Sequence, residues 1–134
     1  MRIYDTMSNT IRDLKLKDPS KVSIYACGPT VQDVPHLGHA RTALTYDVLK
    51  RYLVWAGFEV FLVSNITDID DKIINRALDE GISEEELAQK YANIHIEQLR
   101  NFGIKDPDER PRATQFIREM ISIIEELMEN GSAY

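Results

Sequence analysis

Two histidines separated by a leucine and a glycine form the strongest chemical pattern in this sequence. His36, Gly38 and His39 lie in the run Pro35-His-Leu-Gly-His39. Imidazoles can donate hydrogen bonds to phosphate oxygens, and such donors help most where charge builds up on phosphorus during adenylyl transfer. A glycine between them removes a Cβ, so an adenine ring or a phosphate can approach the backbone closely. The pattern therefore predicts a nucleotide site.

The same residues also have a plainer interpretation, as polar residues that cap a helix. Their place in the chain favours the nucleotide site. Lys21–Cys27 alternates β-branched and aromatic residues with others and predicts a strand, whereas Gly38–Ala56 has apolar residues at helical spacing and ends at Gly57. A helix that begins just after a strand offers free N–H groups and partial positive charge to a phosphate.

The elements around this pattern predict an α/β fold. Phe58–Val63 is an apolar run that predicts a buried strand, and with Lys21–Cys27 it completes a strand–helix–strand unit. The two strands of such a unit are parallel, and ligands bind at their carboxyl ends. Residues 1–20 predict a strand or loop packed on the domain. We therefore expect a Rossmann-like nucleotide-binding half over residues 1–67.

Residues 68–134 predict a helical extension. Asp68–Glu80 and a helix that opens at Ser83–Glu86 are followed by a polar loop, Lys105–Arg112. The last helix carries an apolar stripe predicted to be core: Ile117, Ile121, Ile124 and Met128. In the acidic run Asp68, Asp70 and Asp71, we expect Asp68 to be the helix N-cap, although carboxylates could also bind Mg²⁺.

Other single residues are predicted to have ordinary roles. His95 is predicted to be a surface or boundary residue of its helix. Arg41, Lys50 and Arg51 could form a modest basic face, but exposed side chains that serve solubility are the expected interpretation. Cys27 is the only cysteine, which excludes an intramolecular disulfide and a closed site made of cysteines alone. A small buried residue at a strand end is its simplest interpretation.

Composition bounds the classes of protein. With 43% hydrophobic and 28% charged residues, the chain is expected to fold, and a net charge of −6 argues against a protein that mainly grips nucleic-acid phosphates. There is no signal peptide pattern at the start, and no apolar run approaches the roughly 20 residues of a membrane span. We expect a cytoplasmic protein that does not insert in membranes.

Three ordered blocks of sequence resemble the cysteinyl-tRNA synthetases, a family of class I aminoacyl-tRNA synthetases. His36-Leu-Gly-His39 is similar to the HIGH motif of that class. The blocks are Cys27–Val31 with Pro35–Thr42, then Asn65–Ile74, then Pro111–Thr114 and the closing Gly131–Tyr134. The resemblance covers the whole chain and implies the N-terminal part of the catalytic domain, with residues 68–134 leading to its connective insertion.

The resemblance also implies an activity and a set of site residues. The family activates L-cysteine with ATP and Mg²⁺ and transfers it to tRNA-Cys. It implies that His36 and His39 are catalytic and bind ATP with Gly38, and that Cys27 is one ligand of a Zn²⁺ that recognises cysteine. Substrate-binding residues would be Gly28, Thr30 and Thr67.

The chain departs from the family pattern in what it lacks. No second cysteine and no KMSKS-like lysine loop are present. We therefore expect a fragment that is inactive alone and that exposes an apolar edge and face where the second half of the catalytic domain docks. Three alternatives remain open: a mycothiol-type cysteine ligase, a small HxGH nucleotidyltransferase, and a non-catalytic nucleotide-binding module.

Overall fold

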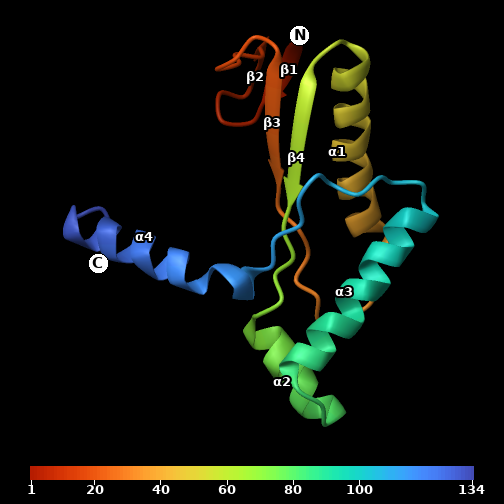
Figure 1. Ribbon diagram of the computed structural model, residues 1–134, viewed down its shortest axis with the longest axis vertical. Coiled ribbons are helices and arrows are strands. Elements are labelled where there is room, and N and C mark those ends of the chain that lie inside the picture. Colours follow the sequence, from red (N-terminus) through yellow and green to blue (C-terminus); the bar gives the residue numbers. More distant parts are fainter.

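The computed structural model describes all 134 residues and contains the predicted strand–helix–strand unit (Figure 1). Strands β3 (Lys21–Ala26) and β4 (Glu59–Ser64) are parallel and pair along their whole length. Helix α1 (Leu37–Trp55) connects them and lies against β4. The prediction of a mixed α/β fold with a parallel strand pair is therefore confirmed.

The first residues form a small sheet of their own. Strands β1 (Arg2–Asp5) and β2 (Thr10–Asp13) pair antiparallel and are not joined to the β3–β4 sheet. Every residue of β2 is exposed. The prediction of a strand in this region is correct, but the strands contribute no buried residue to the core.

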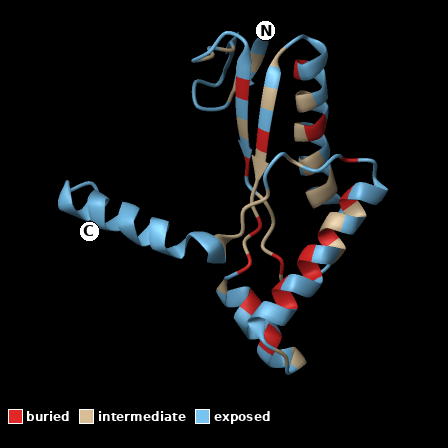
Figure 2. Cartoon of the chain, in the orientation of Figure 1, coloured by how far each residue is buried: buried red, intermediate tan, exposed pale blue.

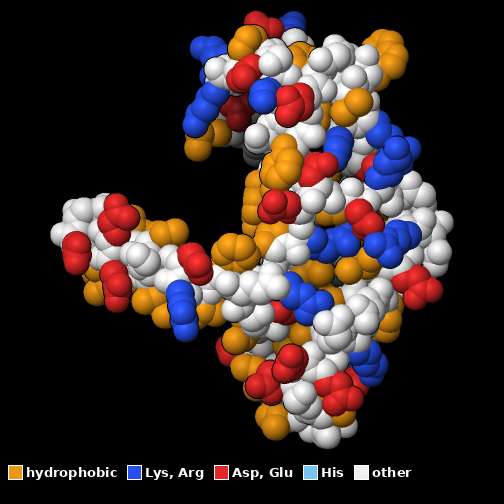
Figure 3. All heavy atoms as spheres, viewed as in Figure 1, with side chains coloured by type: hydrophobic (Ala, Val, Ile, Leu, Met, Phe, Trp, Pro, Cys, Tyr) orange, Lys and Arg blue, Asp and Glu red, His pale blue; other side chains and the backbone are white.

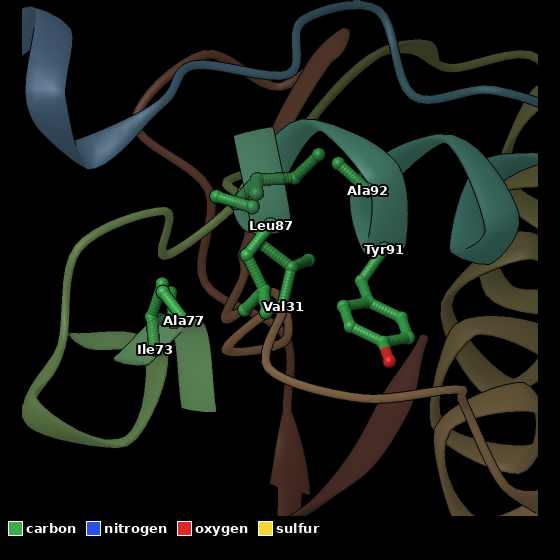
Figure 4. Close-up of a cluster of buried hydrophobic side chains, with 8 residues drawn as sticks. Val31, Ile73, Ala77, Leu87, Tyr91 and Ala92 are labelled. Carbon is green, nitrogen blue, oxygen red and sulfur yellow. The ribbon is translucent and has the colours of Figure 1, made fainter. Parts of the chain in front are cut away.

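Helices α2 (Asp71–Glu80) and α3 (Glu84–Asn101) pack together below the strand pair and carry the main apolar cluster (Figures 1 and 4). Figure 4 shows side chains of both helices meeting the loop residue Val31. Ser83 caps α3 by accepting a hydrogen bond from the Glu86 N–H at 3.1 Å, as its sequence pattern predicts. The loop after β3 is therefore fixed by packing.

The N-cap of α2 differs from the prediction. Asp70, and not Asp68, accepts a hydrogen bond from the Lys72 N–H, at 2.9 Å. Asp68 is instead buried, with 8% of its surface exposed, and accepts from both the backbone N–H and the hydroxyl of Thr114, at 3.0 and 2.7 Å. This carboxylate ties the segment after β4 to the short 3₁₀ helix η1 (Ala113–Phe116).

Replacing Asp68 with alanine is expected to lower the free energy of unfolding by about 2 kcal/mol, because two hydrogen bonds to a buried charged acceptor are lost. Urea denaturation followed by circular dichroism measures this change. Asp71→Ala is the matched control: Asp71 is exposed in the first turn of α2, so its removal is expected to cost about 0.5 kcal/mol or less. Equal losses of unfolding free energy in the two variants would contradict a stabilising role for the Asp68–Thr114 hydrogen bonds.

The last helix, α4 (Ile117–Glu129), contradicts a prediction. None of its residues is buried, so the stripe of Ile117, Ile121, Ile124 and Met128 is not core. Helix α4 points away from the remaining elements, and no part of this chain covers its apolar face (Figures 1 and 2). The helical spacing correctly predicted the helix, but it does not show whether another segment covers the apolar face.

The strand pair also exposes apolar side chains. Only Leu62 of β4 is buried, so the prediction of a buried strand is wrong, and Phe61 and Tyr25 are 46% and 62% exposed. Figure 3 shows hydrophobic side chains along α4 and beside the strands. These surfaces agree with the expected exposed apolar face. That the rest of a catalytic domain docks on them stays a prediction.

The segment after α3 runs along the outer edge of β4. The Asp108 carboxylate accepts from the Leu62 N–H and from the Lys50 ammonium, both at 2.6 Å, and these contacts lower the pKa of Asp108, the Leu62 hydrogen bond most. Further along, the Ser64 N–H donates to the Glu109 carbonyl at 3.0 Å. The segment therefore carries Lys105 and Arg110 to the ends of the strands.

Two of the three basic residues of α1 that were expected to be exposed for solubility are paired. Lys50 contacts Asp108, and Arg51 donates to the buried Asp47 carboxylate at 2.8 Å and to the Gly103 carbonyl at 2.7 Å. Helix α1 is thus joined to the segment after α3 by its basic side chains.

None of the helices is long and apolar enough to cross a membrane.

Candidate active site

A cavity of about 640 Å³ opens at the carboxyl ends of β3 and β4, beside the start of α1. It brings together five of the residues singled out in the sequence: Cys27, Gly28, Thr30, His36 and His39. The loops that follow the two strands, α1, α3 and the segment after α3 all contribute to its walls. This is the end of a parallel strand pair at which α/β proteins bind their ligands.

The two histidines of the pattern cap α1 reciprocally. His36 Nδ1 accepts from the Gly38 N–H, and His39 Nδ1 accepts from the His36 N–H, each at 3.1 Å. Their rings stack with centroids 4.0 Å apart. A neutral imidazole that accepts at Nδ1 carries its hydrogen at Nε2, so both Nε2–H groups remain available as donors.

The capping interpretation and the nucleotide interpretation therefore describe the same side chains. Each histidine uses Nδ1 for the helix and keeps Nε2 for another acceptor. The first turn of α1 contains no acidic residue, so no side chain there compensates the partial positive charge of the helix end. A phosphate in the cavity would meet two ring donors and this field together.

The structure gives a different reason for a glycine at position 38 from the one predicted. A Cβ at Gly38 would lie 2.8 Å from Cε1 of the His36 ring, so the glycine makes room for that ring. The space was expected to be open to a ligand, but the capping histidine fills it. Gly38 is not among the residues that line the cavity, and its contact with ATP stays a prediction.

The loops after β3 and β4 are joined where the cavity begins. The Gly28 N–H donates to Asn65 Oδ1 at 2.7 Å, the Thr67 N–H donates to the Pro29 carbonyl at 3.0 Å, and the Val31 N–H to the Thr67 carbonyl at 3.2 Å. Thr67 belongs to this ladder and does not line the cavity. Gly28 and Thr30 do line it.

Cys27 lies immediately after β3, at the cavity wall, as an exposed free thiol. The interpretation as a small buried residue is therefore wrong. No group of three or more His, Cys, Asp or Glu side chains in the chain is arranged to hold a metal ion. A tetrahedral zinc site needs three or four protein ligands. The residues of this chain alone do not fit such a site, and Cys27 offers one donor.

His95 was predicted to be a surface or boundary residue, but it is buried, with only 7% of its surface exposed, and it lines the cavity. Its ring stands edge-on to that of His39, with centroids 6.1 Å apart and planes at 84°. The sequence held a signal for this. His95 is four residues after Tyr91 and four before Leu99, so it belongs to the buried stripe of α3.

The cavity also gathers charged and polar side chains that were not named as site residues in the sequence. Lys72, Lys105 and Arg110 line it together with Asp33 and Asp47. Figure 3 shows Lys and Arg side chains grouped across the middle of the molecule. The Oε1 atom of another lining residue, Gln32, is buried without a hydrogen-bond partner. The cavity is therefore a polar site with local positive charge.

Burial keeps two of the histidines neutral. It is the main cause that lowers the pKa of His39, and the neighbouring His36 contributes. Burial also lowers the pKa of His95 to about 4, with smaller contributions from His39 and Arg110. At neutral pH both rings are thus uncharged, and for His39 acceptance at Nδ1 requires this, because an imidazolium has no acceptor nitrogen.

The lowered pKa of His95 predicts acid sensitivity. In the unfolded chain His95 becomes protonated below pH 6.5, whereas in the folded chain it stays neutral until about pH 4. The free energy of unfolding is therefore expected to fall by about 3 kcal/mol as the pH drops through this window. Urea denaturation at several pH values measures the slope. His95→Phe should remove that part of it, and an unchanged slope would contradict the assignment.

Comparison with known proteins agrees with the resemblance of the motifs. Residues 13–134 match a family model described as "tRNA synthetases class I (C) catalytic domain". Over all 134 residues the chain is 47% identical to the cysteine–tRNA ligase of Thermodesulfovibrio yellowstonii, 45% to that of Thermococcus gammatolerans and 41% to that of Streptococcus pneumoniae R6. It spans 28 to 30% of the length of these relatives. The chain therefore belongs to the family of class I (C) tRNA synthetase catalytic domains.

Proposed function

We propose that this chain supplies the ATP-binding and part of the cysteine-binding site of a cysteine–tRNA ligase. One observation carries the proposal: two Nε2–H donors lie side by side at the uncompensated start of α1, in a cavity at the ends of β3 and β4. The names of the relatives support the substrate class, since each is a cysteine–tRNA ligase.

In the proposed reaction, ATP lies with its α-phosphate near the start of α1. The carboxylate of L-cysteine attacks the α-phosphorus and pyrophosphate leaves, which gives cysteinyl-adenylate. His36 and His39 donate from Nε2 to phosphate oxygens, where negative charge increases in the transition state. The terminal ribose hydroxyl of tRNA-Cys then attacks the carbonyl carbon of the adenylate and loses its proton, the ester forms as the acyl–phosphate bond breaks, and AMP leaves. Mg²⁺ accompanies ATP and neutralises part of its charge.

The proposal gives Cys27, Gly28, Thr30 and Thr67 places around the amino acid. Gly28 and Thr30 line the cavity, whereas Thr67 supports its wall through the ladder between the two loops. Cys27 would serve as one Zn²⁺ ligand only with further ligands outside these residues. Metal analysis of the purified chain tests this: stoichiometric zinc bound by these residues alone would contradict it.

The division of the chain follows from the same proposal. Residues 1–67 would be the nucleotide-binding part of a Rossmann-like sheet, and residues 68–134 the helical segment that leads to the connective insertion. The exposed faces of β3, β4 and α4 would then be covered by the remainder of a ligase of full family length. Cytoplasmic location, expected from the sequence, stays a prediction.

Two measurements test the function. Calorimetric titration of the chain with a non-hydrolysable ATP analogue should show binding at one site, and His36→Ala with His39→Ala should abolish it. For catalysis, the chain replaces the matching segment of the Thermodesulfovibrio yellowstonii ligase, to which it is 47% identical. Cysteine-dependent exchange of pyrophosphate into ATP by this chimaera is the expected result.

Two of the alternatives give different results in the same chimaera. ATP binding without exchange would favour a non-catalytic nucleotide-binding module. Exchange of pyrophosphate into ATP or CTP that requires an acceptor other than cysteine would favour an HxGH nucleotidyltransferase. A mycothiol-type ligase would pass the cysteinyl group to an aminosugar and not to tRNA-Cys, so an acceptor assay on the full-length protein that contains this chain separates it from a cysteine–tRNA ligase.

A further inference from the structure

We propose that His95 is a positioning residue for His39: its ring, nearly perpendicular to that of His39, holds the His39 imidazole in the orientation that keeps Nε2–H directed away from the helix. This inference rests on the proposed function for its consequence in catalysis. The contact on which it stands is a property of the folded chain alone. His95 belongs to α3, and His39 to the first turn of α1, so the contact joins two separate elements.

The first step is the geometry of the contact. The two rings are 6.1 Å apart and nearly perpendicular, an arrangement that aromatic pairs favour. His95 is 7% exposed, and its side chain forms no hydrogen bond to another group of the chain. Its ring therefore has no polar partner that would explain its burial, and His39 is the ring that it meets.

The second step is what His39 needs. Its Nδ1 accepts from the His36 N–H at 3.1 Å, and this bond places the hydrogen at Nε2. A half-turn of the ring about its Cβ–Cγ bond would break that hydrogen bond and exchange the positions of nitrogen and carbon. The stacked His36 ring contacts His39 at a centroid distance of 4.0 Å, and the perpendicular His95 ring restricts the same motion from another direction.

The third step concerns charge. The charged groups that line the same cavity are Asp33, Asp47, Lys72, Lys105 and Arg110. Asp47 is engaged by Arg51 and by the Lys105 N–H, and Arg110 donates to Asp106 at 2.9 Å. No hydrogen bond or ion pair joins a carboxylate to His39 or His95, so packing and not an acid partner sets the state of these rings.

Nuclear magnetic resonance of the 134-residue chain labelled with ¹⁵N-histidine tests the inference. The chain has three histidines, all in or beside this cavity, so every signal belongs to the site. We expect wild-type His39 to be in the Nε2–H tautomer, with proximity signals between the His39 and His95 rings. His95→Leu fills the space without an aromatic ring. In this variant the ratio of the Nε2–H tautomer of His39 to its Nδ1–H tautomer should fall by up to about tenfold.

His95→Phe is the matched control, because it keeps an aromatic ring and removes the ring nitrogens. It should leave the His39 tautomer as in wild type. A His39 tautomer that is the same in His95→Leu and wild type would overturn the inference. If both variants unfold, wild type decides: mixed His39 tautomers or no contact with His95 would also overturn it.

Adding ATP to the same samples separates this inference from the proposed function. If ATP leaves the His36 and His39 signals unchanged while His95→Leu alters the tautomer, the positioning role stands and the proposed nucleotide site fails. If ATP moves those signals but the tautomer does not depend on residue 95, the nucleotide site stands and the positioning role fails.

Discussion

Replacing His39 with alanine is expected to slow cysteine-dependent ATP–pyrophosphate exchange by about 10²- to 10³-fold in the chimaera that carries this chain. The Nε2–H of His39 is one of two ring donors at the start of α1, and loss of one pre-oriented donor to a transition-state oxygen has this effect. Because the donor matters most where charge develops on phosphorus, the loss should appear mainly in kcat, with a smaller change in the KM for ATP.

Thr45→Ala is the control for this prediction. Thr45 is exposed on the same helix, and its hydroxyl donates only to the Arg41 carbonyl at 2.9 Å, so exchange should stay within about twofold of wild type. Circular dichroism of both variants should show the wild-type helix content. A His39→Ala protein that folds and exchanges at more than a tenth of the wild-type rate would show that His39 acts only as a cap.

Replacing Gly28 with alanine is expected to destabilise the fold by at least about 3 kcal/mol, the upper end of what overpacking costs. An added Cβ would lie 1.5 Å from the Asn65 carbonyl oxygen, which is backbone and cannot move without separating the two loops. The Gly28 N–H bond to Asn65 Oδ1 would be lost with it. Urea denaturation should therefore show a much lower midpoint, or a chain unfolded without denaturant.

Gly38→Ala is the matched control, since a Cβ there meets only the His36 ring, at 2.8 Å. That ring can rotate aside at the cost of its capping bond, about 1 kcal/mol, and alanine returns part of this by its higher helix propensity. The net change in unfolding free energy should stay below about 1 kcal/mol. Equal destabilisation by the two substitutions would contradict the assigned close approach of the loops.

Local patterns were enough to predict most of the elements. Strands at 21–27 and 58–63 and the helix after Gly38 lie within a residue or two of β3, β4 and α1. The reason is that period-two and period-3.6 spacing, together with capping residues and helix-ending glycines, act over a few residues of chain. The histidine pattern was also identifiable, because its place between strand and helix follows from the same signals.

Burial was predicted less well, because it depends on what lies opposite. The α4 stripe has the spacing of a core helix, yet no segment of this chain covers it. Conversely, His95 was judged by its polarity, whereas its place between Tyr91 and Leu99 turns it inward. In both cases the sequence specifies a face of a helix and only the packing of helices decides what that face contacts.

The sequence by itself determined the family, the strand–helix–strand unit and the histidine pair, since each is written in contiguous residues. Only the tertiary structure decided that His36 and His39 each use Nδ1 for the helix, that His95 from α3 meets His39, and that Asp68 holds Thr114 instead of capping α2. Apart from the turn of α1 that the histidines cap, these contacts join residues distant in the chain. Their partners are therefore chosen by folding and not by local spacing.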